Sequence, residues 1–218
     1  MLRGEKPSAT EARVMDIALI LHADHEFNAS TSAARVVAST LADLHSAVIG
    51  ALGALKGPLH GGANEQVMGM LLKIQDPARA ADWVRDALAN KQRIMGFGHR
   101  VYKTWDPRAL WLKNIAKELA DDTGNRQWYD ISQNIEDTVM AEKKLYPNVD
   151  FYSASVYYTL GIPTDLFTPV FAVSRVAGWT AHILEQHAHN RLIRPRALYT
   201  GPQDAQYIPL AERQPQPA

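Results

Sequence analysis

Apolar residues recur every three or four positions along most of this chain, whereas the strict alternation typical of a half-buried strand is nearly absent. The first stretch of this kind, at about 11–22, has its apolar residues at Val14, Ile17, Ala18 and Leu21. Ser8 or Thr10 can cap the helix that this stretch predicts. The pattern as a whole predicts an all-α protein.

Seven further helices are predicted between residues that favour turns. The second, rich in Ala and Ser, is expected over 31–54, with caps at Ser30-Thr31-Ser32 and a stop at Lys56-Gly57-Pro58. The others are expected at about 63–74, 77–90, 106–121, 126–145, 152–160 and 169–190, separated by Gly- and Pro-containing breaks. After Tyr199 the chain carries Gly201-Pro202 and should be extended.

Composition narrows the range of partners. The 218 residues carry 23 Lys and Arg against 23 Asp and Glu, so no general field attracts nucleic acid or anionic lipid. The absence of Cys excludes disulfides, thiolate metal sites and condensing enzymes that load an acyl group onto Cys. No apolar run approaches the roughly 18 residues that span a bilayer. We therefore expect a soluble, cytoplasmic protein without nucleic-acid or membrane partners.

Three short motifs each place one titratable side chain beside Gly or Pro at a helix boundary. They are Gly57-Pro58-Leu59-His60-Gly61-Gly62, Gly96-Phe97-Gly98-His99-Arg100 and Tyr146-Pro147-Asn148-Val149-Asp150. In such places the backbone can hold a group toward a ligand instead of into a core. Two imidazoles and a carboxylate are the groups that a condensation through an enolate needs. Taken singly, Asp150 could instead cap a helix, and His60 could be a loop histidine bonded to backbone.

Other polar residues allow alternatives. His22, His25 and Glu26 fall within one turn and could hold a metal, although no fourth ligand is evident. His182, His187 and His189 do not all share one helix face and are predicted to lie on the surface. Neither a P-loop nor a dinucleotide-binding fingerprint is present.

The three motifs, with His22-Ala23-Asp24-His25-Glu26-Phe27-Asn28, Asp106-Pro107-Arg108 and the segment 167–175, resemble the citrate synthase family. From about Pro7 to about Gln206 the chain is similar to the C-terminal part of the short, dimer-forming prokaryotic type. The resemblance implies an all-α fold with a large-domain part at 1–60, a small domain at 61–164 and a large-domain helix and tail at 165–218. Residues 11–22 and 31–54 would lie at the interface of a homodimer.

The resemblance also implies an activity, the condensation of acetyl-CoA with oxaloacetate and water to citrate and CoA. Asp150 would be the base, His60 the donor to the thioester oxygen, and His99 the group that polarises the oxaloacetate carbonyl. Oxaloacetate would be bound by His25, Asn28, Arg108, Arg175 and Arg194, the last of these acting across the dimer. CoA would be bound by Ile94, Gly96, Gly98 and Lys103. No metal and no cofactor is implied, because acetyl-CoA is a substrate.

Two alternatives remain open at this point. A 2-methylcitrate synthase, which takes propionyl-CoA, would share every catalytic residue named above, and one extra methylene is worth only about 1–3 kcal/mol of discrimination. The chain could also be a non-catalytic fragment that only binds the acid or assembles, because the family's helices that precede Pro7 have no counterpart in these residues. If Met1 is the true start, we expect condensation activity to fall by orders of magnitude.

Overall fold

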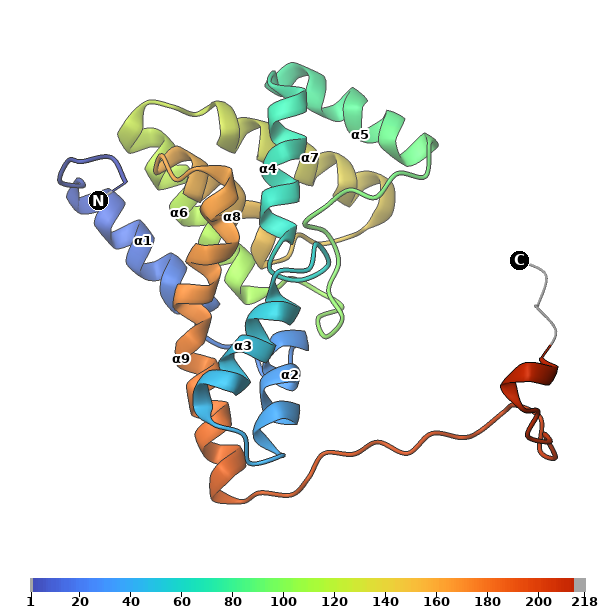
Figure 1. Cartoon of the computed structure of the whole chain (residues 1–218). Coiled ribbons are helices and arrows are strands. Elements are labelled where there is room, and N and C mark those ends of the chain that lie inside the picture. Colours follow the sequence, from blue (N-terminus) through green and yellow to red (C-terminus); the bar gives the residue numbers. More distant parts are fainter. Residues whose placement is uncertain (1, 214–218) are drawn as a thin grey trace.

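The computed structural model describes residues 2–213, and its regular structure in that range is helical (Figure 1). The α-helices are α1 (Ala9–His22), α2 (Ala29–Ala38), α3 (Leu44–Leu55), α4 (Ala63–Ile74), α5 (Ala80–Ala89), α6 (Pro107–Thr123), α7 (Gln127–Lys143), α8 (Val149–Thr159) and α9 (Phe167–Ala188). Short 3-10 turns lie at Pro77–Arg79, Thr164–Leu166 and Leu210–Glu212. The predicted fold class is confirmed.

The predicted helix at 31–54 is wrong as a single element, because the structure divides it into α2 and α3. The chain turns at Leu41, whose φ of 63° lies in the left-handed region and cannot continue a helix. Asp43 then caps α3 by accepting a hydrogen bond from the Ser46 N–H at 3.0 Å. The two helices pack side by side, as their small residues allow (Figure 1).

Two hydrophobic cores organise these helices. The larger core joins α1 with α4 to α8 and includes Val14, Met68, Leu112 and Phe151, all fully buried. The smaller core joins α2, α3 and α9 around the fully buried Trp179. Helix α9 begins in the larger core and continues along α2 and α3, so it connects the two (Figure 1).

The domain boundaries at residues 60 and 164 stay a prediction. Helix α1 lies in the first predicted segment, yet Val14 and Ala18 belong to the same core as the helices of 61–164. Helix α1 also contacts α9, where the Ser174 hydroxyl donates a hydrogen bond to the Leu19 carbonyl. Helix α1 therefore lies between α9 and the helices of 61–164, and His22 at its C-terminal end is buried.

After α9 the chain becomes extended. Asn190 donates from Nδ2 to the Ser39 carbonyl at 3.0 Å, and the Ile193 N–H donates to the Ser39 hydroxyl at 3.1 Å. The following residues are almost all exposed and project away from the helices (Figure 1).

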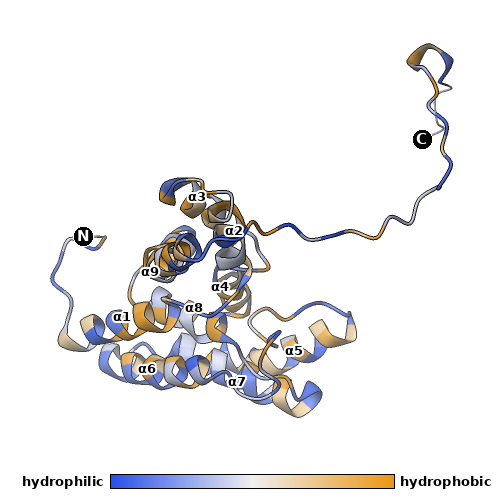
Figure 2. Ribbon diagram, turned by 90° about the horizontal axis from the view of Figure 1, so that it is seen from below, coloured by the Kyte–Doolittle hydropathy of each residue, from blue (hydrophilic) through white to orange (hydrophobic). Residues whose placement is uncertain are grey.

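Each helix carries both hydrophilic and hydrophobic residues (Figure 2). Within residues 2–213, none is long and apolar enough to cross a membrane.

Candidate active site

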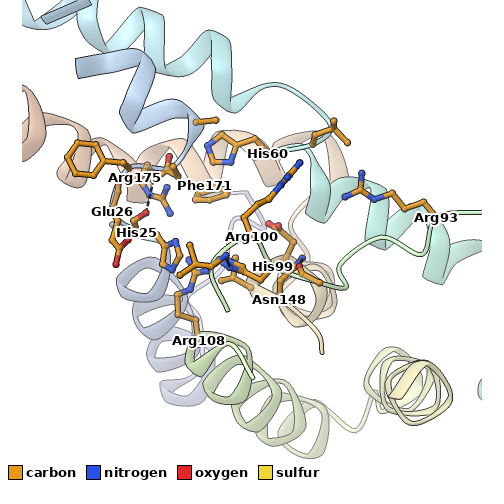
Figure 3. Close-up of a pocket in the computed structure, with 18 residues that line it drawn as sticks. His25, Glu26, His60, Arg93, His99, Arg100, Arg108, Asn148, Phe171 and Arg175 are labelled. Atoms are coloured by element: carbon orange, nitrogen blue, oxygen red, sulfur yellow. Dashed lines mark hydrogen bonds between the residues drawn. The ribbon is translucent and has the colours of Figure 1, made fainter. Parts of the chain in front are cut away.

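A cavity of about 520 Å³ lies where the first turns of α2, α6 and α8 meet the loops before α4 and α6 and the first half of α9 (Figure 3). Seven of the eight residues that the sequence suggested for catalysis or oxaloacetate binding line it: His25, Asn28, His60, His99, Arg108, Asp150 and Arg175. They come from positions up to 150 residues apart in the chain, so the fold brings them together.

Asp150 lies in the first turn of α8, which begins three residues earlier than the predicted start at 152. Asn148 caps this helix by accepting a hydrogen bond from the Asp150 N–H at 3.0 Å, and its Nδ2 donates to the Gly98 carbonyl at 3.0 Å. A Cβ added to Gly96 would come within 2.8 Å of the Phe151 ring, at a φ of +84°. Only Gly fits there, and the close contact fixes the loop that carries His99 against the helix that carries Asp150.

Asp150 is partly buried, and its Oδ1 is shielded from solvent without a hydrogen-bond partner among the described residues. Burial raises the pKa of Asp150 to about 7, against the opposing charges of Arg108 and Arg175. A carboxylate with few hydrogen bonds and a pKa near neutrality is a much stronger proton acceptor than a solvated one. The geometry therefore suits Asp150 to act as a base.

His60 is held by the N-terminus of α2. Its Nε2 accepts a hydrogen bond from the Ser30 N–H at 3.3 Å and lies 2.8 Å from the Ser30 hydroxyl, which in turn accepts from Trp179 Nε1 at 3.1 Å. Because a backbone N–H can only donate, Nε2 is the acceptor and the neutral ring carries its proton on Nδ1. Burial, assisted by the charge of Arg175, lowers the pKa of His60 to about 4. At neutral pH His60 is thus an uncharged hydrogen-bond donor.

His99 has the opposite tautomer. Its Nδ1 accepts hydrogen bonds from the N–H groups of Val101, at 3.0 Å, and Tyr102, at 3.2 Å, so the proton of the neutral ring lies on Nε2. Arg108 Nη2 lies 3.4 Å from that Nε2, and because both groups are donors this longer contact is not a hydrogen bond. The His25 ring meets the His99 ring edge-on with centroids 5.2 Å apart (Figure 3). Burial is the largest cause of the lowered pKa values of His25 and His99, and the charge of Arg108 adds to it. These donors converge on one side of the cavity.

Arg108 is fixed by the buried carboxylate of Asp106, which also caps α6. The guanidinium donates from Nη2 to Asp106 Oδ2 at 2.8 Å and from Nε to Oδ1 at 3.1 Å. Burial acts to raise the pKa of Asp106, but the hydrogen bonds and charge of Arg108 outweigh it and lower the pKa. This ion pair holds the guanidinium at the cavity wall in a defined orientation.

Arg175 lies on α9 and is 1% exposed, so its charge is buried. Its Nε donates to the His22 carbonyl at 2.6 Å, its guanidinium lies over the Phe171 ring at 4.8 Å, and its Nη1 has no partner among the described residues. Burial lowers the pKa of Arg175 to about 10, so the group remains charged at pH 7. A buried cation with a free donor facing a cavity is suited to a carboxylate ligand.

Four of the suggested ligand-binding residues lie elsewhere. Arg194 is exposed in the extended segment after α9, and Lys103 is exposed beside the loop of His99. Gly96 is buried under Phe151, and Ile94 lines a second cavity of about 270 Å³ near the C-terminal end of α7. Of the suggested CoA-binding residues, only Gly98 lines the main cavity. The roles assigned to these four, like those of the residues that line the cavity, stay predictions.

The structure adds residues that sequence reasoning missed. Ser30, which the sequence suggested only as a helix cap, holds His60, and Trp179 donates to the Ser30 hydroxyl. Arg93, Arg100 and Phe171 also line the cavity (Figure 3). Arg100 follows His99 directly, so its position in the motif was an available signal. The pairing of Ser30 with Trp179 spans 149 residues and leaves no local signal.

The alternative of a metal at His22, His25 and Glu26 finds no support. Among residues 2–213, no group of three or more His, Cys, Asp or Glu side chains is placed to hold a metal ion. His22 is buried and donates from Nδ1 to the Ala18 carbonyl at 2.7 Å. Glu26 is exposed, on a residue with φ of 52° that follows the end of α1.

The prediction that three late histidines lie on the surface is confirmed only for His189. His187 is partly buried, with its Nε2 shielded from solvent. The His182 side chain is 17% exposed and contacts Asp24 and Arg35. The prediction failed for His182 because the loop after α1 packs against α9 there, with Asp24 and Phe27 in contact with the ring.

Comparisons with known proteins agree with this geometry. Residues 1–196 match the family model described as citrate synthase, C-terminal domain. The chain is 60% identical over 212 residues to citrate synthase 2 of Bacillus subtilis, covering 97% of this chain and 57% of that one. It is 51% identical to the 2-methylcitrate synthase of Shewanella oneidensis, covering 98% and 57%.

Among solved structures, one of citrate synthase from Thermoplasma acidophilum, described as a ternary complex with carboxymethyl coenzyme A and oxaloacetate, superposes with a TM-score of 0.88 at 46% identity. The match covers 97% of this chain and 57% of that one. The chain thus spans little more than half the length of the relatives it matches. The match to the family model, the identities and the shared fold lead to one conclusion: the chain belongs to the citrate synthase family.

Proposed function

We propose that the protein is a citrate synthase that condenses acetyl-CoA with oxaloacetate and water to give citrate and CoA. The observation that carries the proposal is the juxtaposition, in one cavity, of an unpartnered buried carboxylate, Asp150, with a neutral imidazole donor, His60, and two arginines. The family relatives and the Thermoplasma complex support the choice of substrates.

Oxaloacetate carries two carboxylates, and the cavity offers matching donors. The free Nη1 of Arg175 and the guanidinium held by Asp106 supply forked donors that suit carboxylate geometry. His25 and the Nε2–H of His99 add neutral donors, and His99 would direct its proton toward the ketone oxygen. Charge on that oxygen is what develops when a carbon nucleophile adds to the ketone.

Acetyl-CoA must lose a proton from its methyl group before it can attack. Asp150 would accept that proton, while the Nδ1–H of His60 donates a hydrogen bond to the thioester oxygen as it gains negative charge. The resulting nucleophilic carbon would add to the ketone of oxaloacetate, and the new alkoxide would take the Nε2 proton of His99. The proton that Asp150 accepted would then replace it, which restores both groups. Water then cleaves the thioester of the product, releasing CoA and citrate. The scheme needs no metal and no cofactor, and we assign it to the cytoplasm as part of the proposal.

The proposal is tested by measuring CoA release in the purified protein as its gene encodes it, with acetyl-CoA and with propionyl-CoA, each in the presence and absence of oxaloacetate. We expect release that depends on oxaloacetate and a higher kcat/KM for acetyl-CoA. Oxaloacetate-dependent release with a preference for propionyl-CoA would replace this proposal by a 2-methylcitrate synthase, a function favoured by the 51% identity to the Shewanella relative. No release with either thioester would leave a binding role only.

The two catalytic histidines should differ in their effect on substrate binding. His60→Ala and His99→Ala should each lower kcat by about 100-fold or more, since each removes a donor to a developing oxyanion. Only His99→Ala should also weaken oxaloacetate binding, because His99 lies beside His25 and Arg108 whereas His60 is held by Ser30. Calorimetric titration of oxaloacetate into both variants checks this, and equal affinity in the two would contradict the assignment.

We also propose a homodimer whose interface includes α1, α2 and α3, as the resemblance implies, and in addition α9. The large apolar side chains exposed on these helices include Ile20, at 64%, Ile49, at 66%, and Val173, at 68%. Apolar exposure of this extent on neighbouring helices is typical of an interface. The projecting segment after α9 would then carry Arg194 toward the partner's cavity.

Light scattering at micromolar concentration should give the mass of two chains. Arg194→Ala should leave that mass unchanged and weaken oxaloacetate binding by about tenfold or more, as expected for loss of a charge-assisted contact. A stable monomer with full oxaloacetate affinity would contradict both parts of the proposal.

A further inference from the structure

The loop between α1 and α2, residues 23–28, forms one wall of the main cavity. His25, Glu26, Phe27 and Asn28 all line it (Figure 3). Asn28 is fixed because it caps α2, accepting a hydrogen bond from the Thr31 N–H at 3.1 Å. Among the described residues, the His25 ring has one hydrogen-bond partner, the Tyr102 hydroxyl, which lies 3.2 Å from Nε2 and belongs to the loop of His99. The position of His25 therefore depends on what holds its own loop in place.

Helix α9 supports the loop from behind. A Cβ added to Gly178 would lie 2.4 Å from the Ala23 carbonyl and 2.8 Å from Asp24 Oδ1, so the loop rests directly on the helix backbone. One turn further along α9, His182 lies beside the same loop, with its Nε2 3.3 Å from Asp24 Oδ1. The His182 ring also meets the Phe27 ring edge-on at 5.5 Å. His182 thus contacts the residues on both sides of His25 and Glu26.

The hydrogen bonds of His182 define its tautomer. Arg35, in the second turn of α2, places Nη1 3.1 Å from His182 Nδ1, 3.3 Å from the His182 carbonyl and 2.5 Å from Glu185 Oε2. A guanidinium has no lone pair to accept a hydrogen bond, so Nδ1 of His182 is the acceptor. The proton of the neutral ring is then on Nε2, the atom that lies 3.3 Å from Asp24 Oδ1. His182 thus connects Arg35 on α2, through Nδ1, with Asp24 on the loop, through Nε2.

We propose that His182 is a positioning residue for oxaloacetate binding, which links α2 and α9 to the loop that carries His25. This inference rests on the proposed function. The Arg35–His182–Asp24 series fixes the loop from the side opposite to the cavity, so that His25 presents its ring to the keto acid without having to be ordered when the acid binds. Pre-ordering of this kind lowers the free-energy cost of binding and leaves the groups that move protons untouched.

The test compares His182→Gln with His182→Leu in the complete protein. Gln can still donate to Asp24 from its amide, whereas Leu fills a similar volume without a donor. We expect His182→Leu to weaken oxaloacetate binding, and to raise its KM, about tenfold, with kcat changed less than threefold. His182→Gln should stay within about threefold of wild type. His189→Ala, at the exposed end of the same helix, serves as the matched control and should change nothing. Equal affinities in the Gln and Leu variants would overturn the proposal.

A double-mutant cycle tests the contact itself. Asp24→Ala should weaken oxaloacetate binding about as much as His182→Leu does. The double variant should bind oxaloacetate no more weakly than whichever single variant binds it less tightly. Independent, multiplying effects would show that the two side chains do not act through each other and would overturn the proposal.

A third measurement separates failure of this proposal from failure of the proposed function. NMR of protein labelled with 15N in its histidines reads the tautomer of His182 without any substrate. We expect the Nε2–H form, and we expect the His25 ring signals to shift in His182→Leu but not in His189→Ala. An Nδ1–H form, or unmoved His25 signals, would overturn the positioning role even if the enzyme is active. If the His182 and His25 signals are as expected but the protein binds no oxaloacetate, the result counts against the proposed function and not against the contact.

Discussion

Asp150→Asn is expected to lower kcat for condensation by about 1000-fold or more, because an amide cannot accept the methyl proton of the thioester. Oxaloacetate affinity should change by less than about tenfold, since Arg108 and Arg175, the cations proposed to bind the acid, stay in place. In wild type, the acid limb of the kcat/KM profile should lie near pH 7, the value to which burial raises the pKa of Asp150. Steady-state assays across pH 5–9, with Asp165→Asn as an exposed control, check both expectations.

The same substitution should stabilise the folded protein at alkaline pH. A carboxyl group whose pKa is raised from 3.8 to about 7 on folding favours the folded state while it is protonated, and that contribution is lost as the pH rises from about 4 through about 7. Asn has no charge to bury, so at pH 8 the gain should be on the order of 2–4 kcal/mol. Chemical unfolding at pH 5 and pH 8 measures the difference. A variant that is active, or equally stabilised at both pH values, would rule out a buried titrating base.

Long helices were predictable from this sequence, but one turn between helices was not. Periodic apolar residues located α4, α6, α7 and α9 to within a few residues, because their breaks carry Gly or Pro. Helices α2 and α3 were merged because Ala and Ser continue a helical pattern, and the turn between them relies on Leu41 with a positive φ. The signal that was available is Asp43 three residues before Ser46, the pair that caps α3.

Residues of the site were predictable where Gly or Pro marks them, and their physical state was not. His60, His99 and Asp150 stand in motifs, and the fold brings all three to one cavity. Their burial, which sets the direction of their pKa values, depends on helices distant in sequence and has no local signature. The same holds for Arg175, which a pattern alone places on a helix surface and which packing places against Phe171. The motifs therefore indicated which titratable residues lie at the site, whereas the direction of their pKa shifts required the tertiary structure.

Arg175→Met is expected to weaken oxaloacetate binding by about 100-fold or more while the protein remains folded. The guanidinium is 1% exposed and its Nη1 has no partner among residues 2–213, so its desolvation is only partly compensated until a carboxylate binds. Loss of a buried charge-assisted contact costs about 2–5 kcal/mol, which sets the expected factor. Met has a similar length and can cover Phe171 without a charge.

The effect on stability distinguishes a binding cation from a structural one. Removing an unpaired buried charge relieves its desolvation cost, while the lost hydrogen bond from Nε to the His22 carbonyl costs about 1–3 kcal/mol. The two effects oppose each other, so the free energy of unfolding should change by less than about 2 kcal/mol without ligand.

In wild type, saturating oxaloacetate should raise the thermal midpoint, and in Arg175→Met this rise should disappear. Arg79→Met, an exposed arginine away from the cavity, should keep the full rise. If the Met variant unfolds without ligand but binds the acid normally when folded, Arg175 is a structural residue and the carboxylate site lies elsewhere in the cavity.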